Sequence, residues 1–471
     1  GAPVTADDVL FTISSIQNQE MKTPLEQSFR GVTVEKIDDQ TVQLTLREPF
    51  AAFLEILTVG ILPAHLWRDV PPQTAQLAEY NIRPIGSGPF AFNSFIRDKK
   101  GSIKSYTLRS WSGYYGAAPY MNEIRFAFAP TIDDAIGMVG RGDADGIGTL
   151  PSYVQTLKDK VDVNVKRLPL SQYSALFFNQ KEHPVLKDIK IRQALATAID
   201  REQLIAEALN NNGTPLAGPI VLGALGYTAD LESYPFDIEK AKKLLTDAGW
   251  KEITSDEYSA WKQQREDAER KKQEELAKKE QELLKKQSSK TTDLREVEQQ
   301  TTNISTIKTS TLETATEEER LLPIYRKKDA AILTIQLTTI DQPENRRVAD
   351  IVQRSWEALG VRVILNIRTT NFQKEVIAPR QYEVLLFGIV AGREPDPYAF
   401  WHSSQIEGSG GNLALYSDKK ADALLEDARQ TSDPEVRSAK YKEFQTILTA
   451  ALPAHFLYNP MYTYLLPPSI Y

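Results

Sequence analysis

The segment NQKEHPVLKDIKIRQALATAIDR, from Asn179 to Arg201, carries the most information about the fold of this chain. Pro184 breaks the extended backbone that ends at Asn179, and a helical pattern follows. The apolar residues of that pattern would share one face of a helix: Ile191, Leu195, Ala198 and Ile199. Three charged residues lie where they could bond this helix to neighbouring elements: Arg192, Asp200 and Arg201. The segment predicts a strand, a break and a buried amphipathic helix.

Four further segments accompany this one in a fixed order along the chain. They are GAPVTADDVLFTI (1–13), TVQLTLREPFAAFL with ILPAHLW (41–54 and 61–67), IGSGPF (85–90) and DIEKAKKLLTDAGW (237–250). Together with the first segment they resemble the family 5 extracytoplasmic solute-binding proteins, which are the oligopeptide, dipeptide and nickel receptors of ABC importers. The resemblance covers nearly the whole chain except about residues 252–327.

The resemblance implies an α/β, two-lobed periplasmic-binding-protein fold of type II-like architecture with an extra small lobe. Residues 1–62 would form that small lobe, residues 63–175 and 452–471 the first lobe, and residues 176–451 the second lobe. The strand-rich stretches 163–178 and 452–458 would be the two crossovers between the lobes, and two crossovers make a hinge. The chain opens inside the family pattern, so we expect it to derive from a longer, lipid-anchored precursor.

The composition describes an ordinary globular protein. The chain has 471 residues, of which 41% are hydrophobic and 25% charged, and its net charge is −7. Because no basic stripe stands out, nucleic acid is not expected as a partner. The chain contains no cysteine, which excludes disulfides, thiol nucleophiles and cysteine–zinc sites. The sequence contains no run of about 18 apolar residues, so it predicts no membrane-spanning helix.

Enzyme chemistry finds little support in the sequence. The four histidines do not form a paired metal-binding pattern: His65, His183, His402 and His455. No G-x-S-x-G motif of a nucleophile elbow occurs. We therefore expect no catalytic residue, no metal and no cofactor.

Residues 252–327 do not fit the family pattern. The stretch 265–286 is almost wholly charged, and its Glu–Lys and Glu–Arg pairs at i,i+4 favour a solvated helix. The stretch 288–319 is rich in Ser, Thr and Glu and is predicted to be disordered. The region is either a tolerated surface insertion or an arm that binds a partner.

The candidate ligand site is FGIVAGREPDPYAFW, residues 387–401. In peptide-binding members of the family, the resemblance implies that this strand edge pairs with the ligand backbone, which is indifferent to side chains. The backbones of Gly388 and Val390 would then face the ligand. The chain has Ile389 where the family commonly has Trp, and Arg393 where peptide receptors have an aspartate for the free amino group. Arg393 either faces the cleft, where it would disfavour ordinary peptides with free N-termini, or points to solvent or pairs with Glu394 or Asp396.

Further candidates for the pocket are Ser87 and Gly88 in the glycine-rich turn, Tyr173 beside the crossover, and Trp401. The function that the resemblance implies is capture of peptides or peptide-like solutes by a monomeric receptor, which delivers them to the permease of an ABC importer outside the cytoplasmic membrane. The alternatives are a sensory or scaffold protein that acts through residues 252–327, and a receptor for nickel, haem or sugar ligands.

Overall fold

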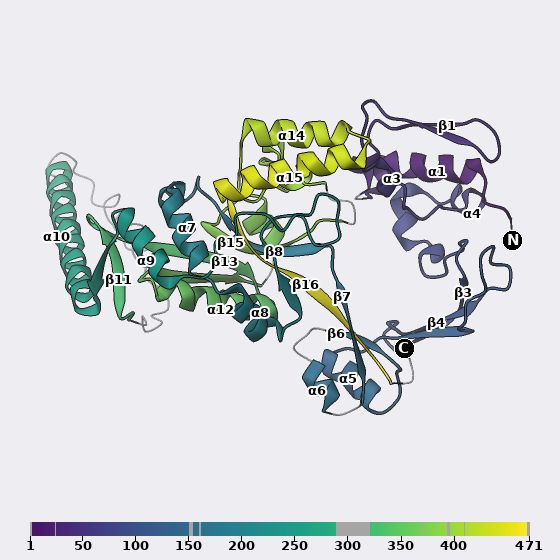
Figure 1. Ribbon diagram of the computed structural model, residues 1–471, viewed down its shortest axis with the longest axis horizontal. Helices are drawn as coiled ribbons and strands as arrows, with labels where there is room; N and C mark the ends of the chain where they lie inside the picture. The colour runs from purple at the N-terminus through teal and green to yellow at the C-terminus, as the bar shows by residue number, and fades with distance from the viewer. Residues whose placement is uncertain are drawn as a thin grey trace.

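The structure is a computed structural model that describes residues 2–23, 25–149, 154–159, 162–288, 321–369, 371–392, 396–408 and 410–468. Two lobes are joined by paired strands (Figure 1). We call the part built on residues 2–169, with the end of β16, the first lobe. The part built on residues 172–459 is called the second lobe.

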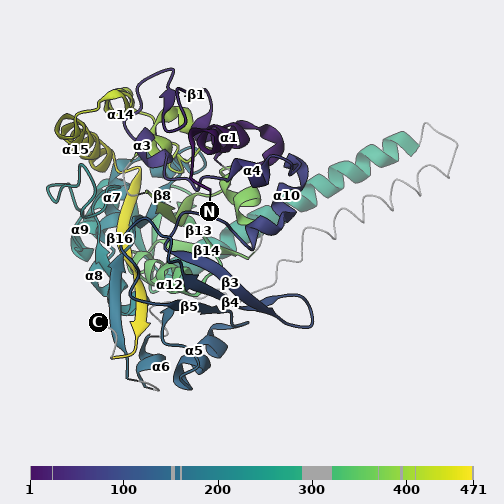
Figure 2. The same ribbon diagram turned by 90° about the vertical axis from the view of Figure 1, so that its right-hand side faces the viewer.

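The first lobe contains short helices and three small groups of strands. Its elements are α1 (Ala6–Gln17), η1 (Gln19–Met21), α2 (Glu26–Phe29), β1 (Thr33–Lys36), β2 (Val42–Thr45), α3 (Phe53–Ile56), α4 (Ala64–Trp67), η2 (Pro72–Leu77), η3 (Glu79–Asn81), β3 (Phe90–Arg97), β4 (Ile103–Ser110), β5 (Glu123–Ala127), α5 (Ile132–Gly140), β6 (Ile147–Thr149), α6 (Val154–Lys158) and β7 (Asn164–Pro169). β3, β4 and β5 form an antiparallel sheet of their own (Figure 2).

The second lobe contains the main sheet and most of the helices. Its elements are β8 (Gln172–Phe178), η5 (Pro184–Lys187), α7 (Ile189–Thr197), α8 (Arg201–Leu209), β9 (Gly213–Pro215), α9 (Ile238–Asp247), β10 (Lys251–Thr254), α10 (Ser255–Ser288), β11 (Ile324–Lys328), β12 (Ala331–Ile332), β13 (Thr334–Ile340), α12 (Pro343–Glu357), β14 (Arg362–Arg368), η6 (Gln373–Ile377), β15 (Val384–Val390), α13 (Tyr398–Trp401), η7 (Ser403–Gln405), α14 (Lys419–Gln430), α15 (Pro434–Ala451) and β16 (Ala454–Leu466).

The main sheet has the order β14-β13-β15-β8-β16, and both of its faces are covered. Side chains alternate along each strand, so Leu176 and Phe178 of β8 enter one core with α7, α8, α9 and α12. Tyr173 and Phe177 enter the opposite core with α13, α14 and α15. This two-sided burial explains why β8 reads as a nearly continuous apolar run.

β16 connects the two lobes. Its first residues pair with β8 in the main sheet, and its last residues pair with β7 and β6. The side chain of Leu465, near its end, is buried in the first-lobe cluster around Ile136 and Leu157. β7 and β8 are the expected strand-rich stretch, and they lie beside β16 (Figure 1). The chain therefore passes between the lobes twice, once from β7 to β8 and once within β16.

The segment 179–201 forms two helices where the sequence predicts one. α7 ends at Thr197, and Asp200 begins α8 because its Oδ1 accepts a hydrogen bond from Gln203 N at 3.0 Å. Asp side chains favour such N-cap positions over helix interiors. Ala198 and Ile199 are still buried in the core as expected, but they lie at the break between the two helices.

Arg192 ties this segment to the junction between α15 and β16. Its Nε donates to Leu452 O at 2.9 Å, and its Nη2 donates to Ala451 O at 2.8 Å. Its Nη1 donates to Leu186 O at 2.5 Å. One buried guanidinium thus satisfies carbonyl groups from two distant stretches of chain, which confirms the predicted role of Arg192.

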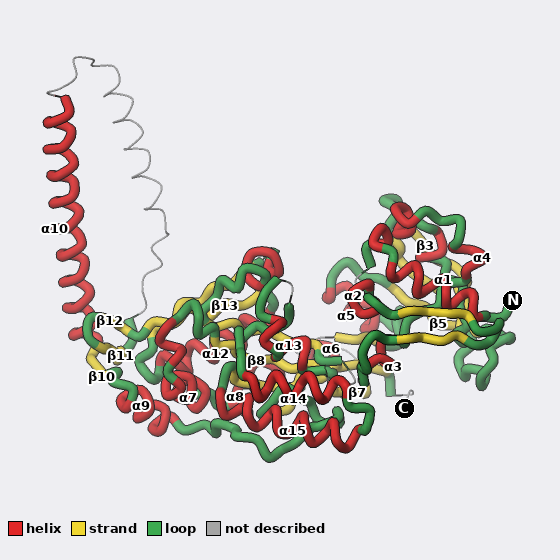
Figure 3. Tube along the Cα trace, turned by 90° about the horizontal axis from the view of Figure 1, so that it is seen from above, coloured by secondary structure: helices red, strands yellow, loops and turns green. Residues whose placement is uncertain are grey.

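The charged segment forms the helix α10, which projects away from the second lobe (Figure 3). Its root is packed, because the rings of Tyr258 and Tyr325 stack with centroids 3.7 Å apart. β10 and β11 pair as a hairpin in which Thr254 lies opposite Ile324. The Ser- and Thr-rich segment predicted to be disordered lies outside the described residues from 289 onward.

Both ends of the range 252–327 therefore belong to the body of the lobe. Arg326 is 2% exposed, and its Nε donates to Leu359 O at 2.7 Å. Its Nη2 donates to Glu252 at 3.0 Å, and its Nη1 donates to Trp250 O at 3.4 Å. The projecting arm thus starts after Thr254 and is inserted into a hairpin whose two strands remain part of the fold.

Candidate ligand site

β15 has a strand neighbour along its whole length on one side and along only its start on the other. It pairs with β8 from Val384 to Val390. Its pairing with β13 covers Val384 and Leu385 and then stops. Among the residues that the structure describes, the second half of β15 is consequently an edge within the main sheet, where main-chain groups can receive another extended chain.

The register of β15 against β8 determines which main-chain groups face this edge. Asn179 N donates to Glu383 O at 2.8 Å, and Ala391 N donates to Ser171 O at 2.8 Å. Residues 383 and 391 are therefore hydrogen-bonded to their opposite partners on the β8 side. Since hydrogen-bonded and non-hydrogen-bonded pairs alternate along an antiparallel ladder, the odd-numbered residues of β15 direct their N–H and C=O groups to β8.

The even-numbered residues consequently direct their N–H and C=O groups away from β8. The carbonyl of Leu386 accepts a hydrogen bond from Thr339 Oγ1 at 2.9 Å, which agrees with this alternation. Gly388 is exposed, and the side chain of Val390 is 70% exposed. The main-chain groups of Gly388 and Val390 thus face the open edge, which supports the orientation expected from the sequence.

The side chains beneath this edge are apolar and closely packed. Ile389 is 6% exposed and belongs to the same core as Tyr173 and Trp401, which are each 1% exposed. Phe387 stacks on Phe372, with ring centroids 5.7 Å apart and planes 12° apart. In this structure Ile389, Tyr173 and Trp401 therefore support the edge from below.

A small cavity lies next to the edge and is lined by Tyr173, Pro219, Ala391, Asp396, Pro397, Phe400 and Trp401. Its volume of about 10 Å³ is close to that needed for one water molecule. Within the described residues, neither Tyr173 Oη nor Trp401 Nε1 makes a hydrogen bond of good geometry. Burial raises the pKa of Tyr173, although Trp401 lies close enough to this tyrosine to lower its pKa slightly. Two buried polar atoms thus lie within reach of one cavity beside the strand edge.

Two of the expected site residues lie elsewhere in the fold. Ser87 and Gly88 are exposed on the loop that leads into β3. Figures 1 and 3 both place β3 in the first lobe, away from β13 of the main sheet. The structure brings together Gly388, Ile389, Val390, Tyr173 and Trp401. Arg393 lies outside the described residues.

Asp396, just before α13, is bound by a residue that sequence reasoning missed. Arg429, in the last turn of α14, donates to Asp396 through Nε at 3.1 Å and through Nη2 at 2.5 Å. Nothing in the local sequence around either residue predicts this pair, because the two lie 33 positions apart.

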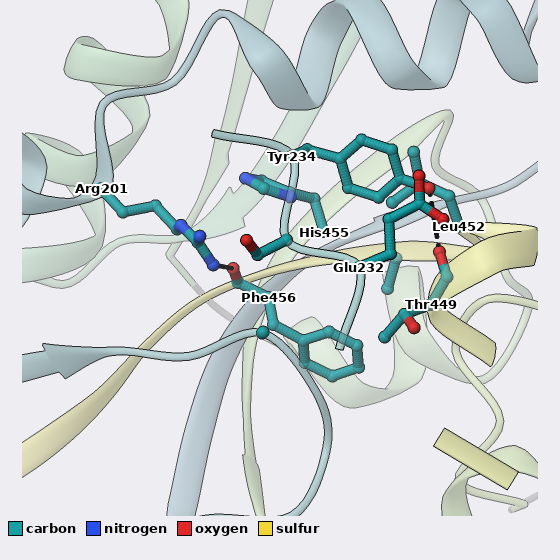
Figure 4. A pocket seen from close by; sticks show the side chains of 10 residues that line it. Arg201, Glu232, Tyr234, Thr449, Leu452, His455 and Phe456 are labelled. Atoms are coloured by element: carbon teal, nitrogen blue, oxygen red, sulfur yellow. Dashed lines mark hydrogen bonds between the residues drawn. The ribbon is translucent and has the colours of Figure 1, made fainter. Parts of the chain in front are cut away.

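A second cavity of about 10 Å³ is lined in part by His455 of β16 (Figure 4). Arg201 and Tyr234 lie on either side of this histidine. Arg201 Nη1 donates to Leu216 O at 2.6 Å, and Tyr234 Oη donates to Thr449 O at 3.0 Å. His455 Nε2 has no hydrogen-bond partner in the described part of the chain. Burial, with a smaller effect from Arg201, lowers the pKa of His455 to about 3.

Two features are absent from the described ranges. No helix there is both long enough and apolar enough to cross a membrane. In the same ranges, no group of three or more His, Cys, Asp or Glu side chains could hold a metal ion.

Comparison with known proteins places this geometry in context. The chain is 24% identical over 469 residues to the oligopeptide-binding protein AppA of Bacillus subtilis, and the aligned region covers 98% of this chain and 73% of that protein. It is 21% identical over 468 residues to the dipeptide-binding protein of Escherichia coli, covering 96% and 72% respectively.

The structure of the Bacillus subtilis AppA protein in complex with a nonapeptide matches 99% of this chain and 80% of its own, with a TM-score of 0.65 and 23% identity. This likeness confirms the predicted two-lobed α/β fold. The family model for bacterial extracellular solute-binding proteins, family 5 (middle), matches residues 1–412. The chain therefore belongs to family 5 of the bacterial extracellular solute-binding proteins.

Proposed function

We propose that this chain captures peptides or peptide-like solutes by adding the ligand as a strand to the open edge of β15, and that it delivers them to the permease of an ABC importer. The observation that carries the proposal is the outward direction of the main-chain groups of Gly388 and Val390. Main-chain pairing suits a receptor for many peptides, because every peptide presents the same backbone groups.

The names of the relatives support this substrate class, since they are described as oligopeptide- and dipeptide-binding proteins. The proposed work is capture without chemical conversion. Ligand on the edge would stabilise a closed arrangement of the lobes, with bending where β7 leads into β8 and along β16, since the chain passes between the lobes at these two places. The receptor would act outside the cytoplasmic membrane, anchored there by a lipid.

The alternation along β15 allows a test that separates ligand bonds from folding. Val390→Pro removes an N–H that points to the open edge and leaves the hydrogen bonds to β8 in place. One lost hydrogen bond is worth about 0.5–1.5 kcal/mol, so the Kd for a peptide should rise about 2- to 10-fold. Val390→Ala keeps the N–H and is the matched control.

The measurement is calorimetric titration of ligand-free protein with penta-alanine and with penta-alanine methylated on alternate backbone nitrogens. We expect the methylated peptide to bind wild-type protein more weakly and to lose little further affinity in Val390→Pro. Equal binding of both peptides to wild type and Val390→Pro would refute strand addition. Native mass spectrometry on freshly purified protein would test the substrate class, and a co-purified sugar, haem or nickel complex would contradict it.

A further inference from the structure

Arg429 makes contacts with three separate parts of the molecule. Its guanidinium binds the carboxylate of Asp396 through two nitrogens, and the side chains of Arg429 and Asp396 are only 32% and 20% exposed. The guanidinium also lies over the ring of Tyr398, 4.0 Å from its centroid. These contacts join the end of α14 to Asp396 and to the start of α13.

The third part belongs to the first lobe. The guanidinium of Arg429 lies 4.9 Å from the ring centroid of Phe50, and the carbonyl of Arg429 accepts a hydrogen bond from Ala51 N at 2.7 Å. Phe53, two residues after Ala51, is buried in the first lobe, where its ring packs against Phe29. Figures 1 and 2 both show α3 beside α14. The end of α14 is therefore a docking point between the two lobes.

Asp396 connects this docking point to the ligand edge. It lines the small cavity beside β15 together with Ala391 and Tyr173, and Ala391 directly follows the edge residue Val390. A ligand that changes the position of the cavity wall would thus also change the position of the carboxylate that holds Arg429. The guanidinium would transmit that change to Phe50, because its face is stacked on that ring.

We propose that Arg429 is a positioning residue that links the occupancy of the β15 edge to the docking of the first lobe, and so to the separation of the lobes. The proposal rests on the proposed function, since it takes peptide as the ligand. Arginine is suited to this role because its planar fork binds a carboxylate with two nitrogens while its face stacks on aromatic rings. A lysine keeps the charge and loses both features, which makes Arg429→Lys the informative variant.

The lobe separation can be measured directly because the chain contains no cysteine. Spin labels on Ser14→Cys and Thr446→Cys, at exposed positions of the first and second lobes, report the interlobe distance by double electron–electron resonance. We expect Arg429→Lys to broaden the distance distribution without peptide and to reduce the shift caused by penta-alanine. Coupling between sites commonly changes affinity about 5- to 150-fold, so the Kd for penta-alanine should rise within that range.

Phe50→Ala removes the partner ring in the first lobe and should change the distance distribution in the same direction. Arg354→Ala is the matched control, because Arg354 pairs with Glu207 at 3.0 Å within the second lobe. A distance distribution and a Kd unchanged in Arg429→Lys and Phe50→Ala would overturn the proposal. If wild-type protein bound no peptide, the proposed function would fail, and the peptide-free distance distributions would still decide whether Arg429 holds the lobes.

Discussion

His455 provides a stability prediction with a defined sign and pH window. The side chain is 3% exposed on β16, and burial, followed by the charge of Arg201, lowers its pKa from the ordinary value of 6.5 to about 3. Between these two values the unfolded chain binds a proton that the folded chain excludes. The free energy of unfolding is therefore not reduced by His455 above pH 6.5, and it decreases as the pH falls from 6.5 toward 3.

The magnitude follows from the two pKa values. Between pH 6.5 and pH 3, each unit by which the pH falls lowers the free energy of unfolding by about 1.4 kcal/mol. Lowering the pH from 7 to 4.5 covers about two such units, so the wild type should lose about 3 kcal/mol through His455. His455→Leu and His455→Gln remove the titrating group, one with an apolar and one with a polar side chain. Both should lose this part of the pH dependence, whatever their stability at pH 7.

The assay is urea unfolding at pH 7 and pH 4.5, followed by the fluorescence of the tryptophans, of which Trp356 and Trp401 are buried in the second lobe. Other ionisable groups contribute to the pH dependence as well, such as Glu344, whose pKa is raised by burial. They are present in every variant, so the comparison between proteins cancels their effect. The same pH dependence in wild type and both variants would show that His455 is not held neutral by the fold.

Two further predictions concern the framework of the second lobe. Replacing residues 255–323 with Asn-Gly should leave a folded protein, because Thr254 and Ile324 are directly opposite and a two-residue turn fits between them. Replacing residues 252–327 should instead reduce the yield of soluble protein, because that change removes the buried Arg326. Equal yields of the two shortened proteins would contradict this expectation. Arg192→Ala should lower the unfolding free energy by about 1–3 kcal/mol for each carbonyl left without a donor, and a urea midpoint within error of wild type would refute the tie that Arg192 makes.

Much of the fold could be predicted because the second lobe follows simple periodicities. The strand-rich stretch 163–178 contains β7 and β8, as expected, and the first part of the expected helical pattern after Pro184 is α7. The break between α7 and α8 was missed because the apolar spacing continues through Ala198 and Ile199. There the local hydrogen bond of Asp200 outweighs the spacing.

The candidate site could be predicted only in part. Resemblance to the family indicates the strand that carries Gly388 and Val390, whereas the direction of their main-chain groups depends on the register with β8. That register is fixed by Asn179 and Glu383, which lie far apart in the sequence. Arg429 gives no local signal at all, since its role comes from partners brought together by folding.

The way the arm joins the second lobe makes that lobe a convenient host for foreign domains. Thr254 and Ile324 face each other across a ladder, where opposite Cα atoms are about 4.5–5.5 Å apart. A guest whose own termini lie close together can be spliced between them, and lengthening such a surface loop costs little closure entropy. A fluorescent protein inserted there would move together with the second lobe. With a dye attached to the first lobe, energy transfer between the two fluorophores would report movement of the lobes.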